Sequence, residues 1–334
     1  MSRFTDLGND LYTGARSFDF VGRRRRWYLI SLLLVVVCLA GPFIRGWATN
    51  TPAYNFGIEF TGGSEFIVSG PATTDKALAA NAVESIDGAV IPKVSLIGSS
   101  SIRVQTTQMT NDQTVLVKNA LAKAYSVPAT NVTSSFIGAT WGQDITSQAI
   151  RGLIVFVILA AIVMALYFRT WKMSVVAVVA LLHDVVITAG IYGLTGFEVT
   201  PGAVIGLLTI LGYSLYDTVV VFDKIRENTI GSMRDMSRTF GQQVNLAVNQ
   251  TLVRSINTSV VAALPVASIL FIGAFVLGAG TLRDISLALL IGIVVGTYST
   301  LFLAAPMYAG WRSKDSAVAA SDVKLIQAQE RASA

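Results

Sequence analysis

The chain has 334 residues, of which 53% are apolar and 13% charged. Because soluble domains contain about 25% charged residues, this composition excludes an ordinary soluble enzyme and predicts several membrane spans. One Cys and one His exclude a disulfide framework within the chain and a Cys/His zinc site. In a soluble chain the net charge of +5 would suggest nucleic acid. In a membrane protein it indicates basic cytoplasmic loops, so we expect no nucleic-acid partner.

Six apolar segments are long enough to cross about 30 Å of hydrocarbon. The expected spans are Trp27–Trp47, Ile150–Phe168, Met173–Leu194, Pro201–Phe222, Ser255–Leu277 and Ile285–Tyr308. The first apolar run is too long for a signal peptide, and no A-x-A site follows it. We therefore expect residues 27–47 to form a retained first span and residues 149–310 to form the other five.

Basic residues lie beside alternate ends of the spans. Arg23–Arg26 precede span one, and Lys224 and Arg226 lie between spans four and five. Arg312 and Lys314 follow span six. The positive-inside rule then predicts that both termini are cytoplasmic. Residues 1–26 would form a cytoplasmic N-terminus and residues 311–334 a mobile cytoplasmic tail. The chain is therefore expected to cross a membrane several times.

Residues 48–148 are polar enough to form a domain outside the cytoplasm. Thr61-Gly62-Gly63-Ser64 predicts a turn between two extended runs, at residues 54–60 and 65–68. Thr73 or Thr74 would cap a first helix, and Thr110 or Asn111 a second. Strands are expected at residues 90–97, 101–106 and 131–137. After the opening strand this order is β-α-β-β-α-β, which predicts an inserted α+β ferredoxin-like extracytoplasmic domain.

The segment at residues 232–249, between spans four and five, has helical periodicity. Its apolar positions are Met233, Met236, Phe240, Val244 and Val248. One interpretation is an amphipathic helix that lies on the cytoplasmic lipid surface. The other is a helix packed against the bundle, and the sequence does not decide between them.

Charged residues inside spans are costly and usually have a partner or a function. Asp217 lies in span four, Arg254 at the start of span five, and the neighbours His183 and Asp184 in span three. Asp217 could be protonated reversibly, or it could form a static bridge to Arg254 or a hydrogen bond to a neighbouring helix. Asp184 and His183 could have a polar function or could only tie span three to its neighbours, and Arg254 could be a plain basic anchor.

The chain lacks the common sequence motifs for ATP binding and for hydrolytic catalysis. It contains no G-x-x-x-x-G-K-[ST] loop, no H-E-x-x-H and no G-x-S-x-G. A Ser/His/Asp hydrolase would have to use His183 within a membrane helix, and composition leaves open a rhomboid-like intramembrane protease that no motif supports. We expect a non-enzymatic protein without cofactor or metal, whose energy would come from an ion gradient.

Several segments together resemble the SecF family, the smaller partner of the SecDF accessory pair in bacterial protein export. They are Phe56–Ser64 (with Thr61, Gly62 and Gly63), His183–Val185, Gly212–Asn228, Asn249–Ser259 and Leu282–Ser299. The resemblance covers nearly the whole chain and implies an α-helical membrane protein with six transmembrane helices, one half of an RND-type transporter. It implies that Asp217 is the proton-linked aspartate of span four and Arg254 the functional arginine of span five.

The resemblance also implies partners and an energy source. SecD and the SecYEG channel are the expected partners, with YajC and YidC as further candidates, besides the translocating preprotein and the lipid bilayer. Proton flow would drive movements that promote preprotein translocation. Two alternatives remain: a stand-alone RND-type proton-coupled exporter of small molecules or lipids, and a structural scaffold. Because only one six-span half is present, we expect a second, SecD-like chain.

Overall fold

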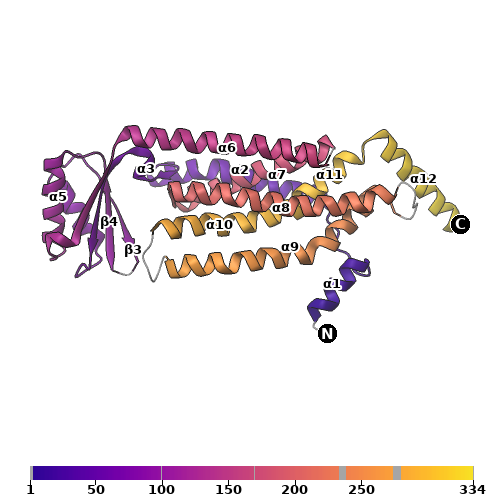
Figure 1. Ribbon diagram of the computed structural model, residues 1–334, viewed down its shortest axis with the longest axis horizontal. Helices are drawn as coiled ribbons and strands as arrows, with labels where there is room; N and C mark the ends of the chain where they lie inside the picture. The colour runs from indigo at the N-terminus through magenta and orange to yellow at the C-terminus, as the bar shows by residue number, and fades with distance from the viewer. Residues whose placement is uncertain (1–2, 99, 169, 233–237, 274–279, 334) are drawn as a thin grey trace.

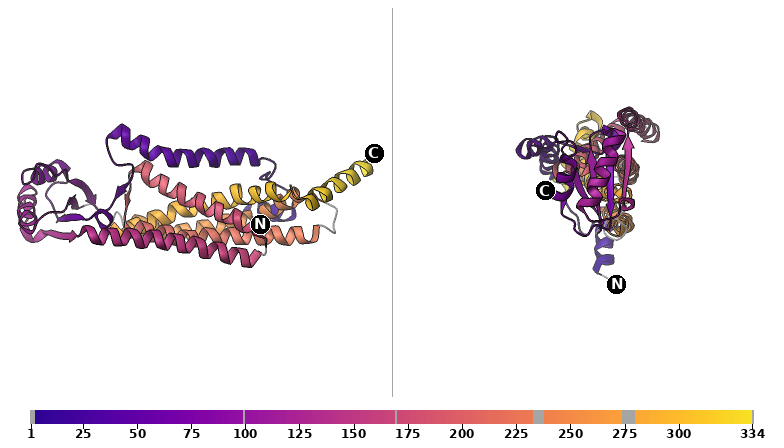
Figure 2. Two further views of the ribbon diagram at one scale, coloured as in Figure 1. Left: turned by 90° about the horizontal axis from the view of Figure 1, so that it is seen from above. Right: turned by 90° about the vertical axis from the view of Figure 1, so that its left-hand side faces the viewer.

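The computed structural model describes residues 3–98, 100–168, 170–232, 238–273 and 280–333. Within them, six helical segments are long and apolar enough to cross a membrane: Arg24–Thr49, Thr140–Phe168, Trp171–Thr195, Pro201–Ile230, Phe240–Phe271 and Gly280–Arg312. These segments form an elongated bundle with an α+β domain at one end, and both termini lie at the opposite end (Figure 1). Viewed along the bundle, the domain lies over its end (Figure 2).

The bundle is built around its third and sixth spans, which are more buried than the others. Its elements are α2 (Arg24–Thr49), α6 (Ala139–Phe168), α7 (Trp171–Thr195), α8 (Pro201–Ser232), α9 (Phe240–Phe271), α10 (Gly280–Tyr298), the π-helical segment η3 (Ser299–Ala304) and α11 (Ala305–Arg312). Glycines let α8 and α10 approach closely. A Cβ at Gly206 would lie 2.8 Å from the Ile285 carbonyl oxygen, and one at Gly292 2.5 Å from the Ile210 side chain.

Several spans belong to helices longer than their apolar runs. The second span belongs to a helix that begins at Ala139, well before Ile150, and the fifth to a helix that begins at Phe240, well before Ser255. Thr239 caps α9 in a reciprocal capping box with Gln242. Hydropathy marks only the lipid-crossing turns, so it missed these polar extensions. The expected end of span five, Leu277, lies outside the described residues.

The external domain has the predicted β-α-β-β-α-β order. Its elements are β2 (Gly63–Ser69), α4 (Lys76–Glu84), β3 (Lys93–Ile97), β4 (Ser101–Thr106), α5 (Asn111–Ala124), the short η1 (Ala129–Asn131) and β5 (Val132–Ile137). The sheet order is β3-β4-β2-β5, with every neighbouring pair antiparallel. Its core joins sheet and helix residues, among them Phe66, Val104 and Leu121. The ferredoxin-like prediction is confirmed.

The predicted hairpin at the start of this domain is wrong. Residues 54–60 are not one extended run: β1 (Asn55–Phe56) is followed by the short helix α3 (Ile58–Thr61). β1 pairs in parallel with β6 (Glu198–Val199), in the connection between α7 and α8. Because the partner strand comes from a distant part of the chain, the local turn signal could not reveal this pairing.

One helix cap also differs from expectation. Asp75, rather than Thr73 or Thr74, caps α4, since its carboxylate accepts from the Ala77 N–H at 2.9 Å. The cap of α5 is Thr110, as expected, in a capping box with Gln113. Both caps supply acceptors to helix N–H groups that would otherwise have none.

Within the segment at residues 232–249, the described part Phe240–Asn249 packs against the bundle instead of lying on the lipid surface. Val244 and Val248 are fully buried in the main core. Asn245 and Asn249 bond to the chain that follows α1 (Arg3–Thr13), where Asn249 Oδ1 accepts from the Phe18 N–H at 2.7 Å. Met233 and Met236 lie outside the described residues. The lipid-surface interpretation is therefore wrong for Phe240–Asn249.

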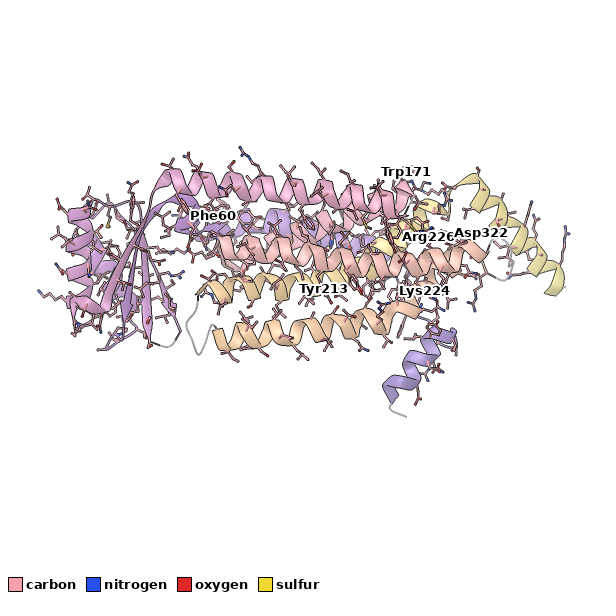
Figure 3. The ribbon with its side chains drawn as sticks, viewed as in Figure 1. Phe60, Trp171, Tyr213, Lys224, Arg226 and Asp322 are labelled. Atoms are coloured by element: carbon pink, nitrogen blue, oxygen red, sulfur yellow. The ribbon has the colours of Figure 1, made fainter. Side chains whose placement is uncertain are left out.

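The C-terminal tail is helical, where a mobile end was expected. It forms α12 (Ser316–Ser333). Asp315, just before it, bonds to Lys172 and Arg312, and the hydrogen bond from Lys172 lowers the pKa of the Asp315 carboxyl. Asp322 accepts from the Phe240 N–H at 2.9 Å. These contacts tie the tail to the bundle end, where Asp322 and Arg226 lie (Figure 3).

Candidate functional site

Asp217 lies inside the bundle on α8 and is buried. Its Oδ1 accepts a hydrogen bond from Ser255 Oγ on α9 at 2.8 Å. Among the described residues, its Oδ2 is buried and has no hydrogen-bond partner. Tyr213, one turn before Asp217, lies near the middle of the bundle (Figure 3). The carboxyl group therefore has one supported oxygen and one oxygen that could accept a proton.

Arg254 is the neighbour of Ser255 on α9, but its side chain is exposed. One of its guanidinium nitrogens lies 3.5 Å from the hydroxyl of Tyr216, the neighbour of Asp217. Two consecutive residues of α8 thus meet two consecutive residues of α9. In the described part of the chain, Asp217 and Arg254 contact different partners. Of the two structural alternatives for Asp217, a bridge to Arg254 or a hydrogen bond to a neighbouring helix, the structure shows the hydrogen bond.

His183 and Asp184 form a separate buried group on α7. Asp184 Oδ2 accepts from Ser214 Oγ of α8 at 2.6 Å, and Asp184 Oδ1 lies 3.3 Å from His183 Nδ1. The imidazole stacks on the Tyr298 ring at 6.2 Å between centroids. The Tyr298 hydroxyl lies 3.1 Å from Ser31 Oγ of α2. This group therefore joins four helices, and it contacts α8 at Ser214, three residues before Asp217.

Hydroxyl groups continue from Asp217 toward α10. Ser259, one turn after Ser255 on α9, lies 2.6 Å from Thr297 Oγ1 of α10. Tyr213 donates to Ser259 Oγ at 3.4 Å. A polar line therefore connects α8, α9 and α10 through neutral side chains.

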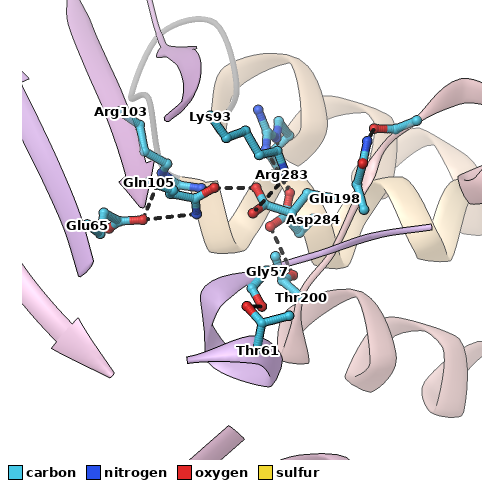
Figure 4. A network of polar contacts seen from close by, with 12 residues as sticks. Gly57, Thr61, Glu65, Lys93, Arg103, Gln105, Glu198, Thr200, Arg283 and Asp284 are labelled. Atoms are coloured by element: carbon cyan, nitrogen blue, oxygen red, sulfur yellow. Dashed lines mark hydrogen bonds and ion pairs between the residues drawn. The ribbon is translucent and has the colours of Figure 1, made fainter. Parts of the chain in front are cut away.

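A second polar group joins the external domain to the bundle (Figure 4). Glu198 of β6 lies 3.4 Å from Lys93 Nζ of β3 and 3.4 Å from Arg103 Nη1 of β4. Arg103 Nε lies 3.3 Å from Glu65 Oε2 of β2. Two strands of the domain are thus tied to Glu198 in the connection between α7 and α8, and β2 joins them through Arg103. We call Glu65, Lys93, Arg103 and Glu198 the junction.

Asp284 extends this group into the membrane helices. At the start of α10, it accepts from Thr200 Oγ1 at 3.0 Å and from Arg283 Nη2 at 3.0 Å (Figure 4). Thr200 lies two residues after Glu198, so the junction and Asp284 are neighbours in space. Sequence reasoning missed Glu198, Arg103 and Asp284. The available signal was an isolated acid beside a span end, at Glu198 and again at Asp284.

Thr61, Gly62 and Gly63 are structural residues of the domain entrance. Gly62 and Gly63 have φ of 72° and 148°, and a Cβ at Gly63 would lie 2.3 Å from the Thr106 carbonyl oxygen. Only glycine fits there without displacing β4. Glu59, in α3 beside them, is partly buried, and burial raises the pKa of its carboxyl. In the described residues no cluster of three His, Cys, Asp or Glu side chains could hold a metal.

The chain is similar to proteins of one family along nearly its whole length. The profile of the C-terminal part of the protein export membrane proteins SecD and SecF matches residues 116–314. The chain is 42% identical to the protein translocase subunit SecF of Streptomyces coelicolor, covering 98% of this chain and 85% of that protein. The chain belongs to the SecF family. A SecF of Rhodothermus marinus is 31% identical over 90% of this chain and 95% of its own length.

A solved structure shares the SecF-family fold. The crystal structure of SecDF, a translocon-associated membrane protein from Thermus thermophilus, superposes with a TM-score of 0.75 at 28% sequence identity. The match covers 90% of this chain and 39% of the solved one. This SecF-family chain therefore spans about two fifths of that SecDF chain.

Proposed function

We propose that this SecF-family chain is a non-catalytic accessory subunit of the bacterial protein-export machinery. It works with a SecD-type partner and uses the proton-motive force to promote preprotein translocation through SecYEG. It crosses the cytoplasmic membrane several times, with both termini in the cytoplasm. Support comes from the names of its relatives, protein translocase subunits, and from the likeness to a translocon-associated SecDF.

The observation that carries the proton role is the unpartnered oxygen of buried Asp217. A buried carboxylate without a fixed cation gains by binding a proton, whereas a nearby guanidinium favours the charged form. Arg254 lies next to the Ser255 that bonds Asp217, yet contacts Tyr216. A small shift of α9 against α8 would change how strongly Arg254 acts on Asp217. Protonation and helix movement are thereby coupled.

The route from Asp217 to the external domain runs along α10. Ser259 and Thr297 join α9 to α10, and Asp284 at the other end of α10 lies beside the junction. One charge that crosses about 100 mV releases about 2.3 kcal/mol. Breaking a buried ion pair costs about 3 kcal/mol or more, so about two protons could release or reseat the domain.

The proposal is tested by Asp217→Asn in vesicles that contain SecYEG and a SecD-type partner. We expect the gradient-dependent part of preprotein translocation to fall at least tenfold, about 1.4 kcal/mol or more in the coupled step, while translocation without a gradient is unchanged. Asp223→Asn, in the same helix, is the matched control, since Asp223 accepts from the exposed Tyr167 hydroxyl. Unchanged gradient dependence in Asp217→Asn would favour a scaffold role instead. Replacing the proton gradient with a sodium gradient identifies the coupling ion.

The stand-alone exporter is distinguished by its partners. Purification of the native complex should recover a SecD-type chain and SecYEG, and it would detect YajC and YidC if they bind. Recovery of a homodimer alone, with gradient-dependent export of a small molecule or lipid, would favour the exporter.

A further inference from the structure

A large basic cavity lies at the end of the bundle that carries the termini. Its volume is about 890 Å³, and its walls include Arg24, Arg25 and Arg238. Asp19 supplies the one carboxylate of the described wall. The wall therefore carries an excess of two positive charges, and its ligand should be an anion.

The three arginines lie together at the terminal end of the bundle. Arg24 and Arg25 begin α2, whose apolar run starts at Trp27, and Arg238 directly precedes the Thr239 cap of α9. Guanidinium groups bind phosphate oxygens in pairs of parallel hydrogen bonds. A phosphate group in this cavity would meet guanidinium groups from the start of α2 and from the residue that precedes the cap of α9.

An apolar groove adjoins this cavity. Its volume is about 450 Å³, and its walls include Trp27 of α2, Leu252 and Ile256 of α9, and Phe302 of η3. Asp19 borders both spaces. Ile256 lies one turn further from the terminal end than Leu252, so the groove extends from headgroup depth toward the membrane interior.

We propose that the basic cavity and the groove together bind one anionic phospholipid. Its phosphate lies against Arg24, Arg25 and Arg238, and an acyl chain lies in the groove. The groove selects a lipid over free phosphate, because a soluble anion gains nothing from apolar walls. The excess positive charge selects an anionic lipid over a zwitterionic one, since attraction to basic residues grows with lipid charge.

The bound lipid would act on the helix that carries the candidate proton site. Leu252 and Val253 line the groove, and Arg254 and Ser255 follow them directly on α9. Asn245 and Asn249 already hold the chain between α1 and α2 against α9. A lipid between α2 and α9 would add a second connection there, so its presence should favour one packing of α9.

The test is native mass spectrometry of the full chain extracted with its partner subunit. The probes are phosphatidylglycerol and phosphatidylcholine, each added with and without inorganic phosphate. We expect the wild-type chain to retain phosphatidylglycerol at least about tenfold better than phosphatidylcholine, because basic residues attract anionic headgroups. The triple variant Arg24→Gln, Arg25→Gln, Arg238→Gln should lose this preference. Arg23 and Arg26 remain in it to hold the orientation of α2.

Two matched controls separate the possible outcomes. The triple variant Arg26→Gln, Lys324→Gln, Arg331→Gln removes the same charge from exposed positions outside the cavity and should keep the preference. Ile256→Trp fills the groove and should reduce lipid retention several-fold, whereas Val260→Trp, exposed one turn away, should not.

Equal retention of both lipids, or equal losses in both triple variants, would overturn the proposal. Displacement by inorganic phosphate with no effect of Ile256→Trp would assign the cavity to a soluble anion, and a site covered by the partner subunit would exclude the lipid.

Discussion

Carboxylates in the bundle interior and carboxylates at the junction are supported in different ways. Asp217 and Asp184 accept hydrogen bonds from serine hydroxyls at 2.8 and 2.6 Å. Glu198 and Glu65 instead lie 3.3–3.4 Å from cationic nitrogens of Lys93 and Arg103. A hydroxyl can remain bonded when its carboxyl partner takes up a proton, whereas a guanidinium loses most of its attraction.

This difference separates two tasks. In the interior, serine hydroxyls hold the two carboxylates against neighbouring helices without adding charge. The junction holds the domain on the bundle through ion pairs between its carboxylates and cationic side chains. Asp284 combines both kinds of support, since it accepts from one hydroxyl and from one guanidinium group.

The largest effect is expected from Arg103→Ala. The change leaves Glu65 and Glu198 without the guanidinium they share, and their side chains are 14% and 9% exposed. Removing one partner of such a buried pair should lower the free energy of unfolding of the external domain by about 3 kcal/mol. Urea denaturation followed by far-UV circular dichroism measures this loss of stability. Lys93→Ala is the control, because its side chain is 43% exposed and such pairs contribute about 0.5 kcal/mol. Equal losses in both variants would contradict the shared role of Arg103.

Ser214→Ala tests the interior. Asp184 would keep only its contact with His183, and losing a hydrogen bond to a buried polar group should cost about 2 kcal/mol of stability. Denaturation of the whole chain in mixed micelles measures the change. Ser268→Ala, in which an exposed serine donates to its own helix, should be nearly silent. A silent Ser214→Ala would mean that water replaces the hydroxyl.

Thr200→Val tests the residue between the two regions. Asp284 loses one donor and keeps Arg283, so we expect a smaller loss of about 1 kcal/mol in the same mixed-micelle measurement. Thr195→Val, an exposed threonine that donates to Ile191 of its own helix, is the control. A loss as large as that of Ser214→Ala would show that Arg283 does not support Asp284.

The smallest expected effect is on the pH dependence of stability, through Glu59 at the entrance of the external domain. Burial, with Glu198 and Glu65 nearby, raises the pKa of Glu59. The folded chain then binds this proton more tightly than the unfolded chain, so stability falls as pH rises from the ordinary glutamate pKa through the raised one. Glu59→Gln should flatten this part of the thermal-stability profile, and Glu84→Gln, on an exposed position of α4, should not. An unchanged slope in Glu59→Gln would assign it to another group.

The predicted site residues differ in how far the sequence could place them. Asp217, Asp184 and His183 were found because charge inside an apolar span is conspicuous. Their partners Ser255, Ser214 and Tyr298 were not, because serine and tyrosine are ordinary in membrane helices. Glu198 and Arg103 were missed, since each is unremarkable alone and their meeting depends on how the domain seats on the bundle.

Local patterns determined the six apolar spans, the β-α-β-β-α-β order and the Thr110 cap, because each depends on neighbours in the chain. Tertiary structure alone decided the β1–β6 pairing, the burial of Val244 and Val248, and the partners of Asp217 and Arg254. These contacts join segments far apart in sequence, and their geometry follows from the packing of whole helices. The low charge content predicted where charge would matter, and the fold decided which charges meet.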